Sequence, residues 1–239
     1  TTTWQITRME ALVRWHHPRW GLISPSTFIP LAEETGLILA IGEWTQRVAC
    51  QQLQQWRQRL SEAQDLVVSV NLSVKQFASP RLIDTIDEVL AATGLSSQHL
   101  RLEITESALI ENPQTAETML KALSDRGILL GIDDFGTGYS SLSMVHQFPM
   151  QILKIDRSFI QSMEADPRGV AMVQAILALA QSLGMAAIAE GVETEDQLQQ
   201  LRQLGCPYAQ GYCFAQPLPA AEAEQLLLNW PHQNEARAT

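Results

Sequence analysis

The sequence predicts an α/β fold, a modified (β/α)8 barrel of the TIM type in which the first strand is short or missing. Short apolar runs alternate with stretches of helical period, which is the pattern of a parallel sheet covered by helices. The length of 239 residues suits one barrel of this type. The apolar runs also end in polar residues, and the active sites of such barrels lie at the carboxyl ends of the strands.

Seven apolar runs provide the predicted strands. In chain order, the polar residues at their ends are Glu10, Asn71, Glu103, the pair Asp133–Asp134, Lys154, Glu190 and Gln210. Glu106, Asp156 and Glu193 lie just beyond three of these residues. If the parallel strands close into a ring, all of these side chains converge on one mouth. The order of the runs therefore predicts a single, strongly acidic active site.

Stretches of helical period lie between the apolar runs. They cover residues 43–60, 80–92, 113–126, 167–183 and 195–204. Three of them begin at a proline, which suits the first helical turn. The glycines Gly127, Gly184 and Gly205 follow such stretches and are expected to act as helix C-caps before the next strand.

An eighth strand would have to precede Ile6, where only five residues are available. We therefore expect residues 1–239 to form a single domain whose N-terminus is truncated from a longer, multidomain protein. Alternatively, the first five residues take an unusual role in closing the barrel. The tail at residues 231–239 is polar and is expected to fray.

The composition excludes several classes of protein. A net charge of −10 argues against a partner that is a nucleic-acid polymer. No run of about 18 apolar residues could span a membrane, and no secretory signal opens the chain. Cys50, Cys206 and Cys213 form no Cys-x-x-Cys pair and indicate reduced thiols. We expect a cytoplasmic domain, which could belong to a larger membrane-anchored or sensory protein.

Five carboxylates in one mouth would repel one another unless cations separate them. These residues are Glu10, Glu103, Asp133, Asp134 and Glu190. Divalent ions with oxygen ligands (Mg²⁺, Mn²⁺ or Ca²⁺) are the usual counter-charge, and Asn71 adds an amide oxygen. Two ions about 3.5–4 Å apart activate water and stabilise the leaving oxygen of a phosphodiester. Lys154 could orient that water, and Arg14 offers a bidentate contact to phosphate.

Simpler interpretations exist for several of these residues. Taken alone, Glu10 could be a surface glutamate, and Asp133–Asp134 could form a turn. Lys154 could form ion pairs with the acidic cluster without taking part in chemistry. Asp156 could either contact substrate or support the scaffold. His16 and His17 are expected in a loop before a proline, and no histidine has the spacing of a zinc site.

Seven strings of residues, taken in order, closely resemble the motifs of the EAL-domain family of bacterial proteins, from about Met9 to Pro219. They are Glu10-Ala11-Leu12 with Arg14, NLS at 71–73, EITES at 103–107, DDFGTGYSSL at 133–142, LKID at 153–156, AEGVET at 189–194 and QGYCF at 210–214. The resemblance implies a phosphodiesterase barrel that hydrolyses cyclic di-GMP to linear pGpG in second-messenger signalling. It implies two ions of Mg²⁺ or Mn²⁺ as cofactors, with Ca²⁺ as a competing inhibitor.

The same resemblance assigns roles to the residues of the predicted mouth. The ligands implied for one metal ion are Glu10, Asn71, Glu103 and Asp133. Those implied for the second ion are Asp133, Asp134 and Glu190. Glu190 also looks like the general base, and Lys154 looks like the residue that positions the attacking water. Arg14 and Gln210 are implied as substrate contacts, and Asp156 is a further candidate.

A loop directly after the aspartate pair is implied to link the metal site to a dimer contact. Glu106 resembles a glutamate that braces the loop at residues 134–138, and Glu193 is a second candidate for bracing. Gly136 and Gly138 would give that loop backbone angles closed to other residues. We therefore expect a homodimer formed through the segment after Asp134.

Two rival functions belong to other classes of protein. A receptor that binds cyclic di-GMP without cleaving it would be expected to lack a metal ligand or Lys154, and none is missing here. A metal-dependent lyase or aldolase on the same barrel would be expected to show a Schiff-base lysine or phosphate-binding glycines near the last strands. The string Gln210-Gly211-Tyr212 is a poor match for either feature.

Overall fold

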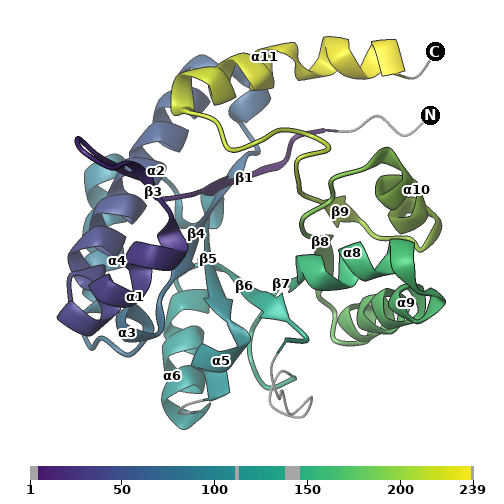
Figure 1. Ribbon diagram of the computed structural model, residues 1–239. Coiled ribbons are helices and arrows are strands. Elements are labelled where there is room, and N and C mark those ends of the chain that lie inside the picture. Colours follow the sequence, from purple (N-terminus) through teal and green to yellow (C-terminus); the bar gives the residue numbers. More distant parts are fainter. Residues whose placement is uncertain (1–4, 111–112, 138–145, 238–239) are drawn as a thin grey trace. The chain divides into compact units, whose positions relative to one another are not determined.

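The computed structural model describes residues 5–110, 113–137 and 146–237 (Figure 1). The chain divides into two compact units. The first consists of residues 1–102, 126–128 and 217–239, and the second of residues 103–125 and 129–216. Strand β5 (Leu100–Thr105) begins in the first unit and ends in the second.

The first unit pairs two parallel strands with several helices. β1 (Arg8–Ala11) lies parallel to β4 (Val67–Leu72), with Glu10 opposite Ser69. The other elements of this unit are β2 (Trp15–His17), β3 (Gly21–Ile23), α1 (Pro25–Thr35), α2 (Ile38–Arg59), the 3-10 turns η1 (Ser61–Ala63) and η2 (Ser97–His99), α3 (Val74–Phe77), α4 (Leu82–Thr93) and α11 (Ala220–Arg237). β2 and β3 form a separate antiparallel hairpin.

The second unit contains four further strands and five helices among its described residues. Its elements are α5 (Glu106–Ile110), α6 (Pro113–Ser124), β6 (Leu129–Phe135), β7 (Ile152–Ile155), α8 (Arg157–Ala165), α9 (Pro167–Ser182), β8 (Ala186–Ala189), α10 (Glu195–Gln203) and β9 (Tyr208–Ala209). The pairs β6–β7, β7–β8 and β8–β9 are all parallel.

Within the described residues, the large sheet has seven strands in the order β1-β4-β5-β6-β7-β8-β9. Its strands follow one another in the order of the sequence, and among the described residues helices lie between β4 and β5, β5 and β6, β7 and β8, and β8 and β9. The α/β fold predicted from the alternation of apolar runs and helical stretches is therefore confirmed. β1 is the strand that carries Glu10, and residues 5–7 before it are not in a strand.

The core of each unit follows from the periodicity of its elements. All four residues of β7 are buried, and so are the first five residues of β5, as expected for parallel strands covered on both faces. Helices add one apolar face each; in α4 that face consists of Leu82, Ile86 and Val89. Gly184 and Gly205 follow the ends of α9 and α10 with positive φ, which confirms their predicted place after helix ends.

Some elements differ from the predicted ones for identifiable local reasons. The sequence does not predict α1 or α11, because prolines at positions 30 and 231 interrupt their patterns. It does not predict α8 either, whose nine residues are mostly polar. α11 continues to Arg237 and so includes most of residues 231–239, whose fraying stays a prediction.

The histidine pair is a further correction. His16 and His17 lie in strand β2 and not in a loop. The strand has only three residues, too few to produce a recognisable alternation of apolar and polar side chains.

Gln46 is a buried polar residue on α2 whose replacement should stabilise the fold. Its side chain is 1% exposed, and neither its amide nitrogen nor its oxygen has a hydrogen-bond partner among the described residues. An unsatisfied buried amide costs about 1–3 kcal/mol, so Gln46→Met is expected to raise the free energy of unfolding by about 1–2 kcal/mol in urea titrations. The exposed Gln55 of the same helix provides the control, since Gln55→Met should change little. A destabilised Gln46→Met would mean that a buried water satisfies the amide.

The three cysteines are free thiols; Cys50 is buried, and Cys206 and Cys213 are half-buried. Burial raises the pKa of Cys50 to about 12 and that of Cys206 to about 11. At pH 8 both stay protonated and unreactive, so iodoacetamide should modify Cys213 first in the native chain. Above pH 9, unfolded thiols ionise and folded ones do not, so stability should fall with rising pH. Mass spectrometry of tryptic peptides checks the order of labelling, and early modification of Cys50 would contradict it.

Candidate active site

The predicted site residues do lie at the carboxyl ends of strands. Glu10 is in β1 and Asn71 in β4, while Glu103 is in β5 and Lys154 in β7. Asp133 and Asp134 are in the second half of β6, and Glu190 and Gln210 directly follow β8 and β9. Glu106 is the first residue of α5, Asp156 precedes α8, and Glu193 precedes α10. The polar residues thus occupy the same place, the carboxyl end, on successive parallel strands.

Lys154 is the central cation of the second unit. Its Nζ lies 2.6 Å from Oε2 of Glu103, 3.1 Å from Oδ1 of Asp133 and 2.7 Å from Oε1 of Glu190. The side chains of Lys154 and Glu103 are each only 2% exposed. A buried ammonium is favourable only with such charged partners, and hydrogen bonds between ions are the strong ones. Lys154 therefore fixes the positions of three carboxylates that come from three different strand ends.

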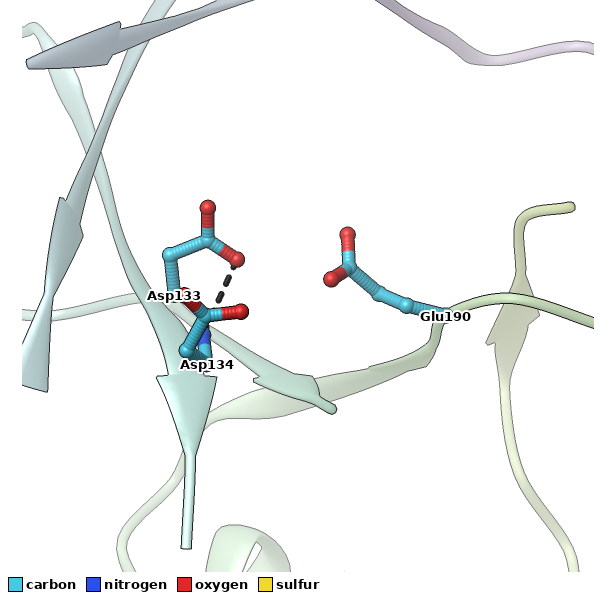
Figure 2. A group of neighbouring side chains, drawn as sticks. All are labelled: Asp133, Asp134 and Glu190. Atoms are coloured by element: carbon cyan, nitrogen blue, oxygen red, sulfur yellow. Dashed lines mark hydrogen bonds between the residues drawn. The ribbon is translucent and has the colours of Figure 1, made fainter. Parts of the chain in front are cut away.

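Asp133, Asp134 and Glu190 form an acidic cluster (Figure 2). One carboxylate oxygen from each lies within 4.8 Å of the other two. The backbone N–H of Asp134 donates to Oδ1 of Asp133 at 3.0 Å. Asp133 is buried, Glu190 is half-buried and Asp134 is exposed, so the cluster extends from the interior of the unit to solvent.

A distortion of β6 allows both aspartates to join this cluster. In a regular strand, neighbouring side chains point to opposite faces of the sheet. Here the register of β6 on β7 shifts between Ile132 and Phe135, and Asp134 has φ of +53°. Bulges of this kind redirect a side chain, and aspartate tolerates the left-handed region better than most residues. Both aspartates therefore belong to a strand, and the alternative in which they form a turn is wrong.

The donor set of the second unit fits divalent cations. Glu103, Asp133 and Glu190 contact the ammonium of Lys154, and Asp134 adds a fourth carboxylate beside Asp133 and Glu190. Four formal negative charges thus stand against one positive charge, an excess of three. All donors are oxygens, which are the ligands that Mg²⁺ and Mn²⁺ prefer. Asp133, Asp134 and Glu190 are the residues that would hold an ion. This is the set that the sequence resemblance assigns to one of the two metals.

The predicted site residues of the first unit form a smaller group. Nδ2 of Asn71 donates to Oε1 of Glu10 at 2.6 Å. The carboxylate of one strand and the side-chain amide of the neighbouring strand are therefore in contact in this unit. Nη1 of Arg14 donates to the carbonyl of its neighbour Val13 at 3.0 Å. The roles of Glu10 and Asn71 as ligands and of Arg14 as a phosphate contact stay predictions.

Glu106 holds the loop that follows the aspartate pair. Its Oε2 accepts the backbone N–H of Gly136 at 2.9 Å, and the residue is buried. Gly136 has φ of +95°, and a Cβ there would lie 2.8 Å from the ring of Phe159, so only glycine suits this position. The contact that a bracing residue needs is present, while its effect on metal binding or dimer formation stays a prediction. The predicted dimer segment includes residues 138–145, which lie outside the described part of the chain.

Backbone contacts hold the loop that carries Glu190 from two sides. The N–H of Glu190 donates to the carbonyl of Ile155 at 3.1 Å. The N–H of Val192 donates to the carbonyl of Gln210 at 3.0 Å, and the carbonyl of Val192 accepts the N–H of Cys213 at 2.9 Å. Glu190 is therefore placed by the β9 segment as well as by its own strand.

Two glycines permit this close packing, and sequence analysis does not identify either as a site residue. A Cβ on Gly191 would lie 2.5 Å from Cβ of Arg157, at the start of α8. A Cβ on Gly211 would collide with the backbone of Val192. A glycine directly after each of the candidates Glu190 and Gln210 is the only signal of this role in the sequence.

Two further candidates have structural contacts of their own. Asp156 caps α8, since its Oδ1 accepts the N–H of Ser158 at 3.0 Å. This contact favours the scaffold role among the two that the sequence leaves open. The side chain of Glu193 is exposed, and its backbone N–H donates to Oε1 of Gln197 at 2.8 Å. A bracing contact in the described loop is made by Glu106, whereas such a role for Glu193 stays a prediction.

No described helix has both the length and the hydropathy needed to cross a membrane.

Comparison with known proteins extends these observations. The chain is 45% identical to MucR of Pseudomonas aeruginosa, a bifunctional diguanylate cyclase/cyclic di-GMP phosphodiesterase, over 92% of this chain and 31% of that protein. It is 42% identical to the cyclic di-GMP phosphodiesterase NbdA of the same organism, over 93% of this chain and 28% of NbdA. The chain thus spans about a third or less of the length of these relatives.

Solved structures give the same result at the level of the fold. The MucR phosphodiesterase in complex with c-di-GMP matches with a TM-score of 0.88 and 44% identity, over 91% of this chain and 87% of that one. The EAL enzyme Bd1971, in its form with cAMP and cyclic di-GMP bound, matches with a TM-score of 0.90 and 33% identity, over 93% of this chain and 61% of that one. The family model described as EAL domain matches residues 1–217. These matches and the arrangement of acidic strand ends show that the chain belongs to the EAL domain family.

Proposed function

We propose that this chain is a metal-dependent phosphodiesterase that hydrolyses cyclic di-GMP to linear pGpG. The observation that supports this most directly is the cluster of Asp133, Asp134 and Glu190 beside Lys154. The names of MucR and NbdA and the c-di-GMP complex of MucR support the choice of substrate.

The proposed chemistry divides between the bound ions and the side chains of the chain. Divalent ions held by Asp133, Asp134 and Glu190 would lower the pKa of water and offset negative charge on phosphate. Glu190 accepts the proton of the attacking water, whose oxygen forms a new bond to phosphorus. The bond between phosphorus and the 3′ oxygen breaks, which leaves a 5′ phosphate and a 3′ hydroxyl that takes its proton from solvent.

Lys154 contributes position and charge. Its contacts to Glu103, Asp133 and Glu190 hold these carboxylates in place, and the ammonium orients water and offsets charge that develops on phosphate. Gln210 and Arg14 are the proposed substrate contacts. Glu10 and Asn71 are proposed as ligands of a further ion, together with Glu103 and Asp133.

The test is a chromatographic assay of cyclic di-GMP hydrolysis by the purified chain. With Mg²⁺ or Mn²⁺ we expect pGpG to form; with EDTA no product should form, and Ca²⁺ should inhibit. Saturable nucleotide binding without product under all metal conditions would instead indicate a receptor. If the chain showed no nucleotide binding and formed no product, the proposal would be contradicted.

Glu190→Gln should abolish turnover, because the amide can neither accept the proton nor supply a charged oxygen. The exposed Glu117 on α6 offers a matched control, since Glu117→Gln makes the same change outside the cluster. The unfolding midpoint of both variants should stay close to that of the parent chain. Retained hydrolysis in Glu190→Gln would remove Glu190 from its proposed role.

A further inference from the structure

The hairpin formed by β2 and β3 has an aromatic surface that the proposed function does not use. Four rings follow one another: the centroids of Phe28 and Trp15 are 5.7 Å apart, those of Trp15 and His17 5.9 Å, and those of His17 and Trp20 4.2 Å. Phe28 is buried in α1, whereas Trp20 is 66% exposed. The series runs from the core of the first unit to solvent and ends on the exposed indole of Trp20.

Contacts within the chain hold the turn that carries Trp20. Nδ1 of His17 accepts the backbone N–H of Arg19 at 3.1 Å and that of Trp20 at 3.3 Å. The rings of His17 and Trp20 are stacked, with an angle of 18° between their planes. An ordered side chain loses little conformational entropy on binding. Tryptophan and arginine are also the residues that contribute most often to the stability of protein interfaces.

The segment of sequence that contains the hairpin is basic, whereas the chain as a whole is acidic. Residues 11–32 contain Arg14 and Arg19 but no aspartate or glutamate, although the chain has a net charge of −10. Two arginines are too few to attract a nucleic-acid backbone or an anionic membrane to such an acidic chain. An acidic protein surface with an aromatic residue is the partner that this composition fits.

A surface of that kind is present on the second unit. Glu195 and Asp196 form the exposed start of α10, and Tyr212 is 60% exposed. Sγ of Cys213 lies 3.9 Å from Oε2 of Glu195, so the segment with Tyr212 lies beside the first turn of α10. The favourable interaction with the helix dipole is a simpler explanation for acidic residues at the start of a helix. It does not explain why a tyrosine beside them is exposed.

We propose that the hairpin of one copy of this chain docks on the α10 surface, defined by Glu195, Asp196 and Tyr212, of a second copy. Trp20 packs against Tyr212, and Arg19 pairs with the carboxylates of α10. Each chain has both surfaces, so the contact is heterologous: one surface binds a different surface of the next chain. It is separate from the homodimer predicted through the segment after Asp134, and it does not depend on the proposed phosphodiesterase activity.

Sedimentation velocity of the purified chain at increasing concentration tests this contact. We expect self-association that weakens with added salt, because charge pairs contribute to it. Arg19→Glu and Glu195→Arg should each lower the association constant by about tenfold or more, since each places like charges opposite one another. The double variant with both changes should recover association, because the charges are exchanged. Arg168→Glu, an exposed change of the same charge outside both surfaces, should have no effect.

Trp20→Ala tests the aromatic part of the contact and should weaken association without changing the unfolding midpoint, because the ring is exposed. A monomer at every concentration would overturn the proposal. So would a dimer whose association constant is unchanged by Arg19→Glu, because that dimer would use another contact. Recovery in the double variant distinguishes a direct pair of surfaces from a general effect of net charge.

Discussion

Replacing Lys154 with methionine is expected to lower the free energy of unfolding of the metal-free chain by about 3–5 kcal/mol and to remove turnover. The change keeps the length of the side chain but removes the ammonium that contacts Glu103, Asp133 and Glu190. The two most buried partners, Glu103 and Asp133, would then be left with uncompensated charge in the interior of the unit. Urea titrations with EDTA and with Mg²⁺ measure the effect, and the ion should recover part of the lost stability in the variant.

Lys121→Met is the matched control for this experiment. Lys121 is exposed on α6, so its replacement should change the free energy of unfolding by less than about 0.5 kcal/mol and leave turnover intact. If Lys154→Met were as stable as the parent chain without metal, the ion pairs of Lys154 would not be what holds these carboxylates. If it kept its turnover, the alternative in which Lys154 only balances charge would be the correct one.

A single methyl group at Gly211 is expected to lower kcat by about 100-fold, a loss typical of misplacing a reacting group by about 1 Å. The added Cβ in Gly211→Ala would meet the backbone of Val192, two residues after Glu190. The backbone hydrogen bond from Val192 to Gln210 would lengthen or break, and Glu190 would move with its loop. Steady-state kinetics should show a lower kcat at saturating Mg²⁺, with a smaller change in KM.

Gly205→Ala distinguishes this effect from a general loss of stability. Gly205 also has a positive φ, of +76°, but a Cβ there would meet no heavy atom within 4 Å. That variant should lose about 1 kcal/mol of stability from backbone strain and keep its kcat. Equal kcat values in the two variants would show that the contact of Gly211 with Val192 does not position Glu190.

The order and type of most elements could be predicted from the sequence because their signals are local. Apolar runs that end at Glu103 and Lys154 are strands β5 and β7. The helical stretches that begin at residues 113 and 167 are α6 and α9, each starting at the predicted proline. Where prolines interrupt the pattern, as in α1 and α11, or where the strand has three residues, as in β2, the same local signals do not identify the element.

The candidate site could be predicted as a set of residues but not as a geometry. Strand ends and family motifs identify Asp133, Asp134, Lys154 and Glu190 from the sequence alone. A regular strand would separate the two aspartates onto opposite faces, and only the shifted register of β6 together with the positive φ of Asp134 brings both to Glu190. That distortion depends on how β6 pairs with β7, which no local pattern of residues describes.

The sequence by itself thus determined the α/β fold, the acidic strand ends and the family, because periodicity and motifs are properties of neighbouring residues. The tertiary structure alone decided three other features. Lys154 lies between three carboxylates, and Gly191 and Gly211 allow other segments to pack closely against the loop that carries Glu190. The side chain of Trp20 stays exposed. The first two depend on contacts between residues distant in the chain. The third depends on which side chains remain uncovered after packing, and neither kind of information is present in a local pattern.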